Sequence, residues 1–270
     1  MSSEGAVVLI TGTTSGIGQA TAELLAAKGY RVFGTSRNPA GKPTTGYELL
    51  QLDVSSDESV AACVAQVAER TGGRIDVLMN NAGTGILGAS EEVSPDEAMR
   101  LFQINFFGVM RMTNAVLPLM RARKAGTIIN MSSSGGVAAI PFAAFYCATK
   151  FALEGYTESL RHELRPLGIA ATVVAPGPVN TPAGEKAMRA SKVIGEYADR
   201  RGKADAMFVK GIHDGMDPAR VAATVLKVVR ARWPGPRYSV GLQSKATNAA
   251  RTLLPRSAFE TAVRWGVGLG

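Results

Sequence analysis

A tyrosine and a lysine stand four residues apart, at Tyr146 and Lys150, in a segment whose pattern predicts a helix. At this spacing both side chains lie on one helix face, a single turn apart. A free phenol has a pKa of about 10, and a neighbouring ammonium favours the phenolate. The pair is therefore suited to exchange a proton with an alcohol or a carbonyl oxygen. Taken alone, such a pair is more often an ordinary helix surface.

A serine adds a hydrogen-bond donor thirteen residues before the tyrosine. Ser133 follows a β-rich run within Ile129-Asn-Met-Ser-Ser-Ser-Gly-Gly136. Its hydroxyl can hold a substrate oxygen in line for proton transfer. Ser132 and Ser134 have the same chemistry, and local turn hydrogen bonding is the alternative role for all three.

A glycine-rich turn follows the first predicted strand. The run Thr11-Gly-Thr-Thr-Ser-Gly-Ile-Gly18 places Gly12, Gly16 and Gly18 where a helix begins. Such a turn lets backbone N–H groups and a helix N-terminus approach a pyrophosphate, and Thr14 and Ser15 add hydroxyl donors. An ordinary tight turn between a strand and a helix is the alternative.

Two charged residues follow the next two predicted strands. The second strand ends at Thr35-Ser36-Arg37, without the acid that binds a ribose 2′-hydroxyl. Arg37 can instead pair with a 2′-phosphate, which favours NADP(H) and leaves NAD(H) open; the alternative is a plain surface arginine. Asp53 suits an adenine amino group or, equally well, the N-cap of the next helix.

The elements that position these residues alternate along the chain. Short runs rich in Val, Ile and Leu, each followed by an amphipathic segment, predict a parallel sheet covered on both faces. We therefore expect one α/β domain over residues 1–270, with a Rossmann-type, doubly wound, seven-stranded parallel sheet. The predicted strands are 6–10, 31–35, 48–52, 75–79, 127–131, 169–175 and 236–240. The predicted helices are 17–28, 59–70, 95–123 with a break near Phe107-Gly108, 144–164 and 219–232.

The segment 180–217 is long for a connection that usually takes about 2–6 residues. Its mixture of apolar and charged residues predicts a substrate lid inserted after the sixth strand. An amphipathic helix docked on the domain is the alternative. Residues 135–142, between Ser133 and Tyr146, carry no charge, which favours a hydrophobic substrate.

Composition excludes several classes of protein. In a chain of 270 residues, 46% hydrophobic and 19% charged residues exclude a disordered or collagen-like chain. Two cysteines and two distant histidines exclude a disulfide scaffold and a local metal site. No secretion signal is visible, and no uncharged apolar stretch approaches the roughly 18 residues of a membrane span. We therefore expect a cytoplasmic protein.

The net charge of +8 is concentrated near the C-terminus, where residues 217–270 hold nine Lys and Arg against Asp217 and Glu260. No nucleic-acid partner is expected, because this region lacks interleaved aromatics and a reading element. Residues 242–270 form a basic amphipathic extension. Such an extension can rest on an anionic membrane surface, making the protein peripheral to a membrane, or pack on its own domain.

Jointly, these motifs resemble the classical short-chain dehydrogenase/reductase family from Val7 to about Gly241. In the family's order they are Thr11-Gly12-x3-Gly16-Ile17-Gly18, Asn80-Asn81-Ala82-Gly83, Asn105, Ser133, Tyr146-x3-Lys150 and Pro176-Gly177-Pro178-Val179-x-Thr181. The resemblance implies that Ser133 orients the substrate and that Tyr146 is the acid/base. It implies that Lys150 binds the nicotinamide ribose and lowers the tyrosine pKa, and that Asn105 holds a water in a proton relay.

The dinucleotide is expected along the carboxyl edge of the sheet. By the resemblance, Pro176, Gly177 and Thr181 flank the nicotinamide. The residues expected to bind the cofactor are Gly12, Thr14, Ser15, Gly16, Ile17, Gly18, Arg37, Asp53, Val54, Asn81, Ala82, Gly83, Tyr146, Lys150, Pro176, Gly177, Val179 and Thr181.

Within the family, the run Glu154 to Arg165, the long lid and Arg237 to Gly241 resemble the branch acting on steroids, retinoids and other lipid alcohols. This implies hydride transfer between NADP(H) and a hydrophobic secondary alcohol or ketone, or a retinal-like carbonyl. A 3-oxoacyl thioester reductase is the alternative enzyme. A non-catalytic NADP(H)-binding sensor and a membrane-surface binding protein are alternatives of another class. The resemblance also implies a homodimer or homotetramer, built through the helices at 95–123 and 144–164.

Overall fold

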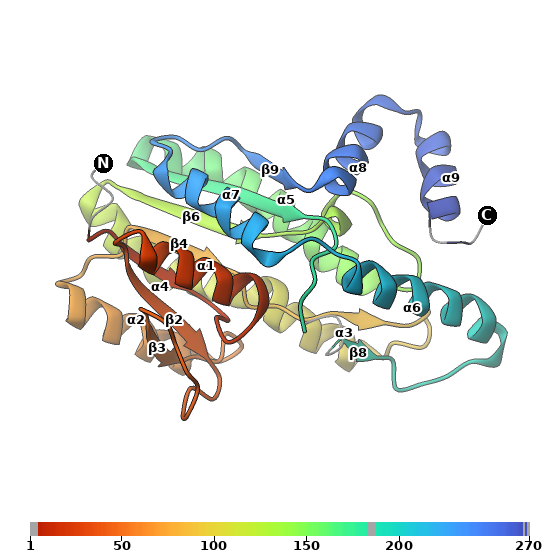
Figure 1. Cartoon of the computed structure of the whole chain (residues 1–270), viewed down its shortest axis with the longest axis horizontal. Coiled ribbons are helices and arrows are strands. Elements are labelled where there is room, and N and C mark those ends of the chain that lie inside the picture. The colour runs from red at the N-terminus through yellow and green to blue at the C-terminus, as the bar shows by residue number, and fades with distance from the viewer. Residues whose placement is uncertain (1–4, 183–186, 267, 269–270) are drawn as a thin grey trace.

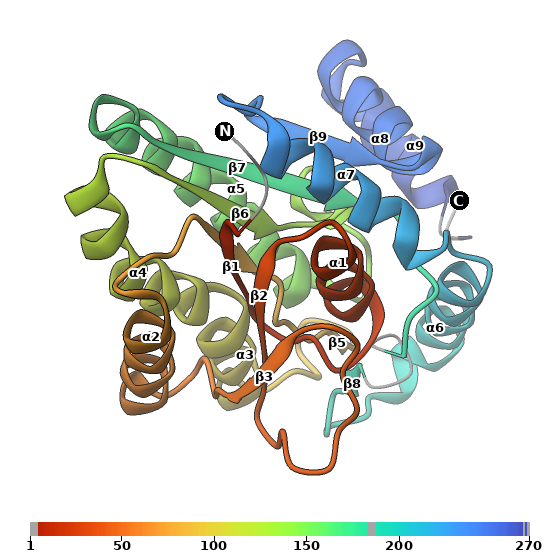
Figure 2. The same cartoon turned by 60° about the vertical axis from the view of Figure 1, so that its left-hand side comes forward.

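Seven parallel strands form the central sheet of the computed structural model, which describes residues 5–182, 187–266 and 268. Their spatial order is β3-β2-β1-β4-β6-β7-β9 (Figures 1 and 2). The strands are β1 (Val7–Ile10), β2 (Arg31–Ser36), β3 (Glu48–Gln51), β4 (Val77–Asn80), β6 (Gly126–Met131), β7 (Ile169–Pro176) and β9 (Arg237–Val240). The order reverses between β1 and β4, the place where open α/β sheets bind ligands. The predicted Rossmann-type single domain is confirmed.

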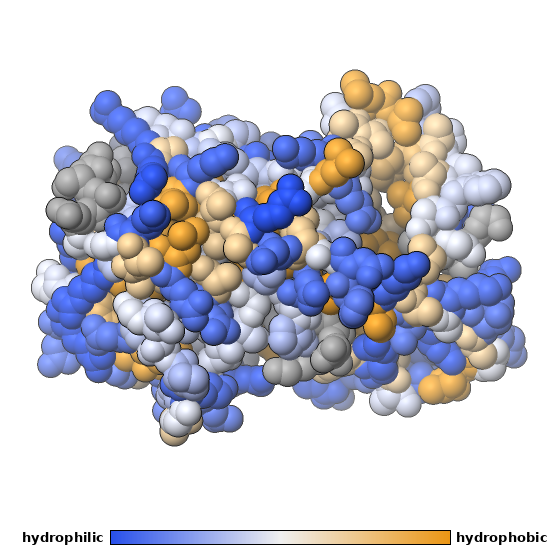
Figure 3. Space-filling model, in the orientation of Figure 1, coloured by the Kyte–Doolittle hydropathy of each residue, from blue (hydrophilic) through white to orange (hydrophobic). Residues whose placement is uncertain are grey.

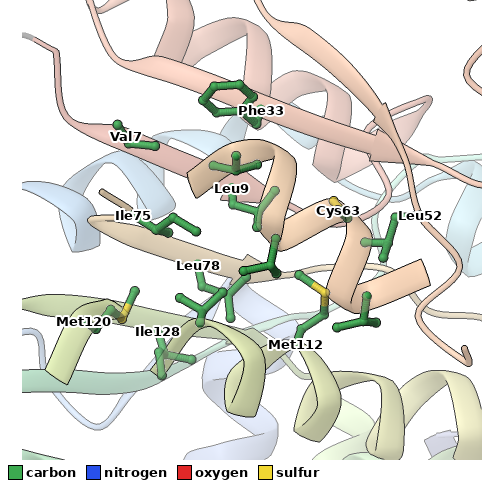
Figure 4. Close-up of a cluster of buried hydrophobic side chains, with 14 of the residues drawn as sticks. Val7, Leu9, Phe33, Leu52, Cys63, Ile75, Leu78, Met112, Met120 and Ile128 are labelled. Carbon is green, nitrogen blue, oxygen red and sulfur yellow. The ribbon is translucent and has the colours of Figure 1, made fainter. Parts of the chain in front are cut away.

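Helices cover both faces of the sheet because successive strand residues point to opposite sides. Val7 and Leu9 face the core under α2 (Asp57–Thr71), α4 (Gly108–Arg123) and α5 (Ala144–Leu164), part of which Figure 4 shows. Val8 and Ile10 face a second core under α1 (Gly16–Ala27) and α7 (Pro218–Arg230). Strands buried on both faces explain the continuous apolar runs of the sequence.

The predicted break in the helix at 95–123 takes the form of a π-helical turn. Helix α3 (Pro95–Phe102) leads into the turn Gln103–Phe107, and α4 continues from Gly108. A Cβ atom at Gly108 would lie 2.8 Å from Cγ2 of Val54, so glycine lets α4 approach the end of β3. Helix α2 begins at Asp57, two residues before the predicted start, because Ser56 caps it by accepting a hydrogen bond from the N–H of Ser59.

The predicted lid, whose residues 183–186 lie outside the described part of the chain, is largely regular structure. Strand β8 (Met188–Arg189) pairs in parallel with β5 (Ile86–Leu87), forming a small second sheet. Helix α6 (Ala198–His213) follows, and its Phe208 packs against buried Leu87 and Cys147. The docked amphipathic helix is therefore the form that this segment takes.

Two buried carboxylates hold the first half of the predicted lid against the body. Glu92 accepts hydrogen bonds from the N–H groups of Ala89 (2.8 Å) and Ile194 (2.9 Å) and pairs with Arg201. Burial raises the pKa of Glu92, but these partners outweigh burial and lower it overall.

Glu97 accepts hydrogen bonds from the N–H groups of Ser94 (2.8 Å) and Ser191 (3.0 Å). The hydrogen bonds from Ser94 are the main reason that its pKa lies at about 2. Both carboxylates therefore stay ionised at neutral pH and hold residues 191–201.

The chain ends in a hairpin of two helices, α8 (Leu242–Leu253) and α9 (Arg256–Gly266). The hairpin stands away from the sheet on the side of α6 (Figures 1 and 2). Residues 267, 269 and 270 of the predicted extension lie outside the described residues. Among the helices described, none is both long enough and apolar enough to cross a bilayer.

Candidate active site

The glycine-rich turn lies between the end of β1 and the start of α1. Gly12 and Gly16 have φ angles of 72° and 58°, in the left-handed region that glycine adopts without strain. A Cβ atom at Gly18 would lie 2.1 Å from the carbonyl oxygen of Gly12, so only glycine fits there. Thr14 is exposed in the turn. Ser15 occupies the N-cap position of α1, but within the described structure its side chain makes no capping hydrogen bond. The first N–H groups of α1 are therefore available to an anion.

The end of β4 supports this turn from below. Nδ2 of Asn81 donates to the carbonyl oxygens of Thr11 and Gly12, at 2.9 Å each. Oγ1 of Thr11 accepts from the N–H groups of Asn81 and Ala82, also at 2.9 Å. A Cβ atom at Gly12 would lie 3.1 Å from Cα of Ala82. Asn81 and Ala82 therefore fix the shape of the turn through contacts within the protein.

Arg37, which follows β2, and Asp53, which follows β3, are close enough for their charges to interact. Asp53 accepts hydrogen bonds from the N–H (2.9 Å) and hydroxyl (2.6 Å) of Ser55. These bonds, together with the charge of Arg37, lower the pKa of Asp53. Because Ser56 caps α2, the N-cap alternative for Asp53 is wrong. Arg37 is exposed at the same edge, whereas Val54 is buried.

The side chains of Ser133 and Tyr146 meet beside Gly135. A Cβ atom at Gly135 would lie 3.3 Å from Cε1 of Tyr146 and 3.6 Å from Oγ of Ser133. The Ser133 hydroxyl accepts from the N–H of Gly135 at 3.1 Å, and it is close enough to the phenol of Tyr146 to lower the pKa of that group in part. The turn hydrogen bond and the contact with the tyrosine therefore coexist.

Lys150 lies one helical turn from the tyrosine, as expected. Its Nζ is 5.8 Å from the centroid of the Tyr146 ring and donates to the carbonyl oxygen of Met131 at 2.8 Å. Burial lowers the pKa of Lys150 to about 8, and the negative charge of Glu154 opposes this. At neutral pH the lysine therefore still carries its charge, but it loses that charge at a lower pH than a lysine exposed to solvent does.

The predicted lowering of the tyrosine pKa is wrong. Burial raises the pKa of Tyr146 above its ordinary value, and the hydrogen bond from Ser133 offsets this only in part. The physical reason is that desolvation disfavours the phenolate, while the ammonium of Lys150 is directed to the carbonyl oxygen of Met131.

Asn105 lies in the π-helical turn, and its side-chain amide is engaged within the protein. Its Oδ1 accepts from the N–H of Thr84 at 2.9 Å, and its Nδ2 donates to the carbonyl oxygen of Thr84 at 2.9 Å and to Oγ1 of Thr149 at 3.2 Å. The position of a Cβ atom at Gly83 would be 3.3 Å from Oδ1 of Asn105 and 3.9 Å from Nζ of Lys150. Asn105 therefore joins the end of β4 to the helix that carries the Tyr/Lys pair.

The end of β7 completes the edge. A Cβ atom at Gly16 would lie 2.9 Å from Cγ2 of Thr181, which places Thr181 against the glycine-rich turn. The N–H of Gly177 donates to the carbonyl oxygen of Val240 at 3.0 Å, and buried Val179 pairs with Met216. The structure thus brings the predicted residues after β1, β4, β6 and β7 to one edge of the sheet.

Sequence reasoning assigned no role to an acid on the catalytic helix. Glu154 follows Lys150 by four residues, and its carboxylate lies 3.2 Å and 3.3 Å from Nε of Arg237. Burial raises the pKa of Glu154, opposed by Ser132 and Arg237. The same i, i+4 spacing that identified the Tyr/Lys pair could have identified this third member.

A second residue that sequence reasoning missed is Ser244 of α8. This buried serine donates its hydroxyl to the carbonyl oxygen of Ala175 at 2.7 Å and so holds the end of β7. No local pattern distinguishes it from the other serines of the sequence.

Comparisons with known proteins agree with this geometry. The short chain dehydrogenase family matches residues 6–192. The 3-ketodihydrosphingosine reductase of Bacteroides thetaiotaomicron is 39% identical over 265 residues, which are 96% of each chain. Retinol dehydrogenase 8 of Bos taurus is 34% identical over 285 residues, covering 96% of this chain and 90% of that one. A crystal structure of a short chain dehydrogenase/reductase from Burkholderia phymatum in complex with NAD is 25% identical, with a TM-score of 0.80 over 94% of both chains.

Proposed function

The chain belongs to the short-chain dehydrogenase family, and from that premise we propose that it transfers a hydride between NADP(H) and a hydrophobic secondary alcohol or ketone, or a retinal-like carbonyl. The observation that carries the proposal is the approach of the Ser133 hydroxyl and the Tyr146 ring to each other around Gly135, at the carboxyl edge of the sheet where the glycine-rich turn also lies. An oxidoreductase acting on CH–OH groups needs such a proton donor next to its dinucleotide.

The residues of the glycine-rich turn fit a dinucleotide. A side chain at Gly12 would press on Ala82 and one at Gly18 would collide with the carbonyl oxygen of Gly12, so the turn keeps its shape only with glycine. The N-terminus of α1 supplies N–H groups for the pyrophosphate. Thr14, Ser15 and Ile17 line the same turn. The bound nicotinamide supplies the hydride in reduction and accepts it in oxidation.

The proposed work of the protein is to position the carbonyl and to manage one proton. Ser133 donates a hydrogen bond to the substrate oxygen, and Tyr146 protonates that oxygen in the reductive direction. Because the pKa of Tyr146 is raised, the phenol holds its proton at neutral pH and is ready as an acid. In the proposal, Lys150 binds the ribose and Asn105 holds the relay water, while Pro176, Gly177, Val179 and Thr181 border the nicotinamide.

The preference for NADP(H) rests on Arg37. Its exposed guanidinium follows β2, where an acid would repel a 2′-phosphate. Asp53 binds the adenine amino group in this proposal, with Val54, Asn81, Ala82 and Gly83 shaping the same edge. The resemblance to a structure in complex with NAD leaves NAD(H) as the second cofactor.

The preference for a hydrophobic substrate rests on what surrounds the Tyr146 ring. Tyr146 packs against two buried apolar clusters, one that includes Ile86 of β5 and Leu101 of α3 and one formed by Leu87, Ala143 and Cys147. Met188 of β8 packs against the first of these clusters. A cavity of about 300 Å³ between β5 and α6 is bordered by Leu87 and Phe142 but also by charged Glu92, Arg189 and Arg201, so the preference rests on the packing around Tyr146 and not on this cavity. Two relatives are named for 3-ketodihydrosphingosine and for retinol, which are hydrophobic molecules.

The remaining parts of the proposal concern the lid, the assembly and the location. In this proposal residues 180–217 form the substrate lid, and α6 is its helix docked on Leu87 and Cys147. Phe107 of the π-helical turn and Phe151 of α5, which are 36% and 40% exposed, favour subunit pairing through the helices at 95–123 and 144–164. A cytoplasmic protein that contacts a membrane peripherally through residues 242–270 fits a hydrophobic substrate.

A cofactor-oxidation screen tests the proposed function. The purified chain is mixed with NADPH or NADH and with a long-chain ketone, retinal, a ketosteroid, a 3-oxoacyl thioester or a short ketone. We expect NADPH-dependent turnover of a long or polycyclic carbonyl, and loss of it in Tyr146→Phe. Turnover of the thioester alone would assign the rival reductase, and cofactor binding without turnover across the panel would contradict catalysis.

A further inference from the structure

The C-terminal hairpin exposes apolar side chains that nothing in the described structure covers. At the tip of the hairpin, Leu253 is 79% exposed and Leu254, in the turn between α8 and α9, is 43% exposed; Leu242, at the start of α8, is 84% exposed. Ser244 and Phe259 are the buried residues of the two described helices. Figure 3 shows the resulting hydrophobic tip at the upper right, on the hairpin that Figure 1 labels α8 and α9. Large apolar side chains at the end of a projecting element mark an interaction site.

The charge around this tip is of one sign. Over residues 242–266 the basic residues are Lys245, Arg251, Arg256 and Arg264, against the single acid Glu260. Arg251 and Arg256 flank the turn directly, and Arg251 lies over the Phe259 ring, 5.3 Å from its centroid. Apolar side chains between cations complement an anionic lipid surface, in which leucine enters the acyl boundary and arginine pairs with headgroups.

The root of the hairpin is fixed to the edge of the sheet that holds the proposed active site. Ser244 binds the end of β7, and Nη1 of Arg237 lies 3.2 Å from Oδ1 of Asn248, the acceptor on α8. At the other end, a Cβ atom at Gly268 would lie 3.4 Å from Sδ of Met207 on α6. The hairpin therefore connects the cleft edge to the predicted lid and presents its apolar tip away from both.

We propose that the α8–α9 turn, with Leu253 and Leu254 inserted and Arg251 and Arg256 at the headgroups, seats the protein on an anionic bilayer, so that a hydrophobic substrate reaches the cleft from the membrane. This deepens the membrane contact of the proposed function, and it rests on the lipid-like substrate class only for the delivery step. The seat itself is independent of catalysis. An interface between two copies of this chain is the competing use of the same tip.

Vesicle sedimentation tests the seat without any activity measurement. The full chain is mixed with vesicles of phosphatidylcholine alone or with phosphatidylglycerol added. We expect the chain to co-sediment with the anionic vesicles and salt to weaken this binding. Each of the variants Arg251→Gln and Arg256→Gln should lower the affinity for these vesicles about fivefold. The double variant Leu253→Asp/Leu254→Asp should lose binding. The matched control Leu167→Asp, at an exposed apolar residue of the main domain, should keep it.

Two results would overturn the proposal. One is equal sedimentation of the natural chain and the Leu253→Asp/Leu254→Asp variant, including the absence of binding in both. The other is a Leu253→Asp/Leu254→Asp variant that binds vesicles as the natural chain does but forms a smaller oligomer by light scattering. This result would assign the tip to a contact between copies of the chain. For delivery, NADPH oxidation is compared with the same ketone in vesicles and in detergent. The variant should slow turnover with vesicles and leave turnover in detergent unchanged, whereas inactivity of both chains in detergent would count against the proposed function alone.

Discussion

At the scale of single residues, Tyr146 and Lys150 lie one helical turn apart, with Nζ of the lysine 5.8 Å from the centroid of the tyrosine ring. The spacing of Tyr146 and Lys150 follows from helix geometry alone, so the sequence suffices to place them one turn apart. Their pKa values depend on burial, which raises that of Tyr146 and lowers that of Lys150 to about 8. Burial is a property of the packed chain, and no local pattern contains it.

Replacing the phenol tests its role as the acid. Tyr146→Phe keeps the ring and its packing but removes the proton, so kcat should fall about 10²- to 10⁴-fold while dinucleotide binding is unchanged. Steady-state kinetics and cofactor titration measure the two quantities. Tyr156→Phe, on the same helix, is the control and should keep kcat. Retained turnover in Tyr146→Phe would show that another group supplies the proton.

Glu154 provides a test of the charge on Lys150. The carboxylate raises the lysine pKa, so Glu154→Gln should lower that pKa below about 8. Lysine is charged below its pKa, and the alkaline limb of the kcat/KM profile should therefore move to lower pH, with the rate at pH 6 nearly unchanged. Glu158→Gln, one turn further along the helix and exposed, should leave the profile in place. Superimposable pH profiles of Glu154→Gln and the natural chain would contradict the proposed effect of the Glu154 carboxylate on the pKa of Lys150.

Arg37 determines the cofactor preference in this account. Arg37→Asp removes a charged partner of the 2′-phosphate and places a like charge there, so KM for NADPH should rise about 10- to 100-fold. KM for NADH should fall or stay constant, because the acid can accept from a ribose 2′-hydroxyl. Initial-rate measurements with both cofactors show the ratio. An unchanged ratio would mean that Arg37 is a plain surface residue.

At the scale of elements, long periodic segments were predictable and short or polar ones were not. The seven strands and the break near Gly108 follow from runs of apolar residues and from a glycine. Strands β5 and β8 have two residues each, too few to show a period, and they pair across a hundred residues of chain. The attachment of residues 191–201 could not be predicted from the sequence either. Glu92 and Glu97 bind the backbone N–H groups of Ile194 and Ser191, which lie about a hundred residues further along the chain.

The attachment by Glu92 and Glu97 should depend on pH. Both carboxyls have pKa values below their usual range in the folded chain, that of Glu97 at about 2. Their stabilising effect is therefore complete above the unfolded pKa of about 4.3 and is lost as the pH falls towards 2. Hydrogen exchange of residues 191–201 should accelerate over this window before the sheet opens. In Glu92→Gln it should be fast at neutral pH, whereas Glu69→Gln, at an exposed acid of α2, should resemble the natural chain. Uniform exchange in all three would contradict the attachment.

At the scale of the whole molecule, sheet order and surface character determine what the fold can present. The reversal between β1 and β4 collects the ends of β1, β4, β6 and β7 at one edge, which explains why residues from 12 to 181 share a site. On the surface, exposed aromatics lie in the π-helical turn and on α5, whereas the basic, apolar tip lies on the C-terminal hairpin. Assembly and location therefore depend on different faces.

The exposed Phe151 gives a test of the expected assembly. Light scattering of the natural chain should give the mass of a dimer or tetramer. Phe151→Glu places a charge in the apolar face of α5 and should shift the mass towards the monomer of 28.3 kDa. An equal mass for both chains would place the subunit contact on another face.

Label transfer tests the central claim most directly. The chain is incubated with a hydrophobic ketone and NADPH that carries deuterium at the transferred position of the nicotinamide, and the product is analysed by mass spectrometry. The account predicts an alcohol with one deuterium on the former carbonyl carbon, and no such product with Tyr146→Phe. Binding of the cofactor without any labelled alcohol, across the panel of hydrophobic carbonyls, would contradict it.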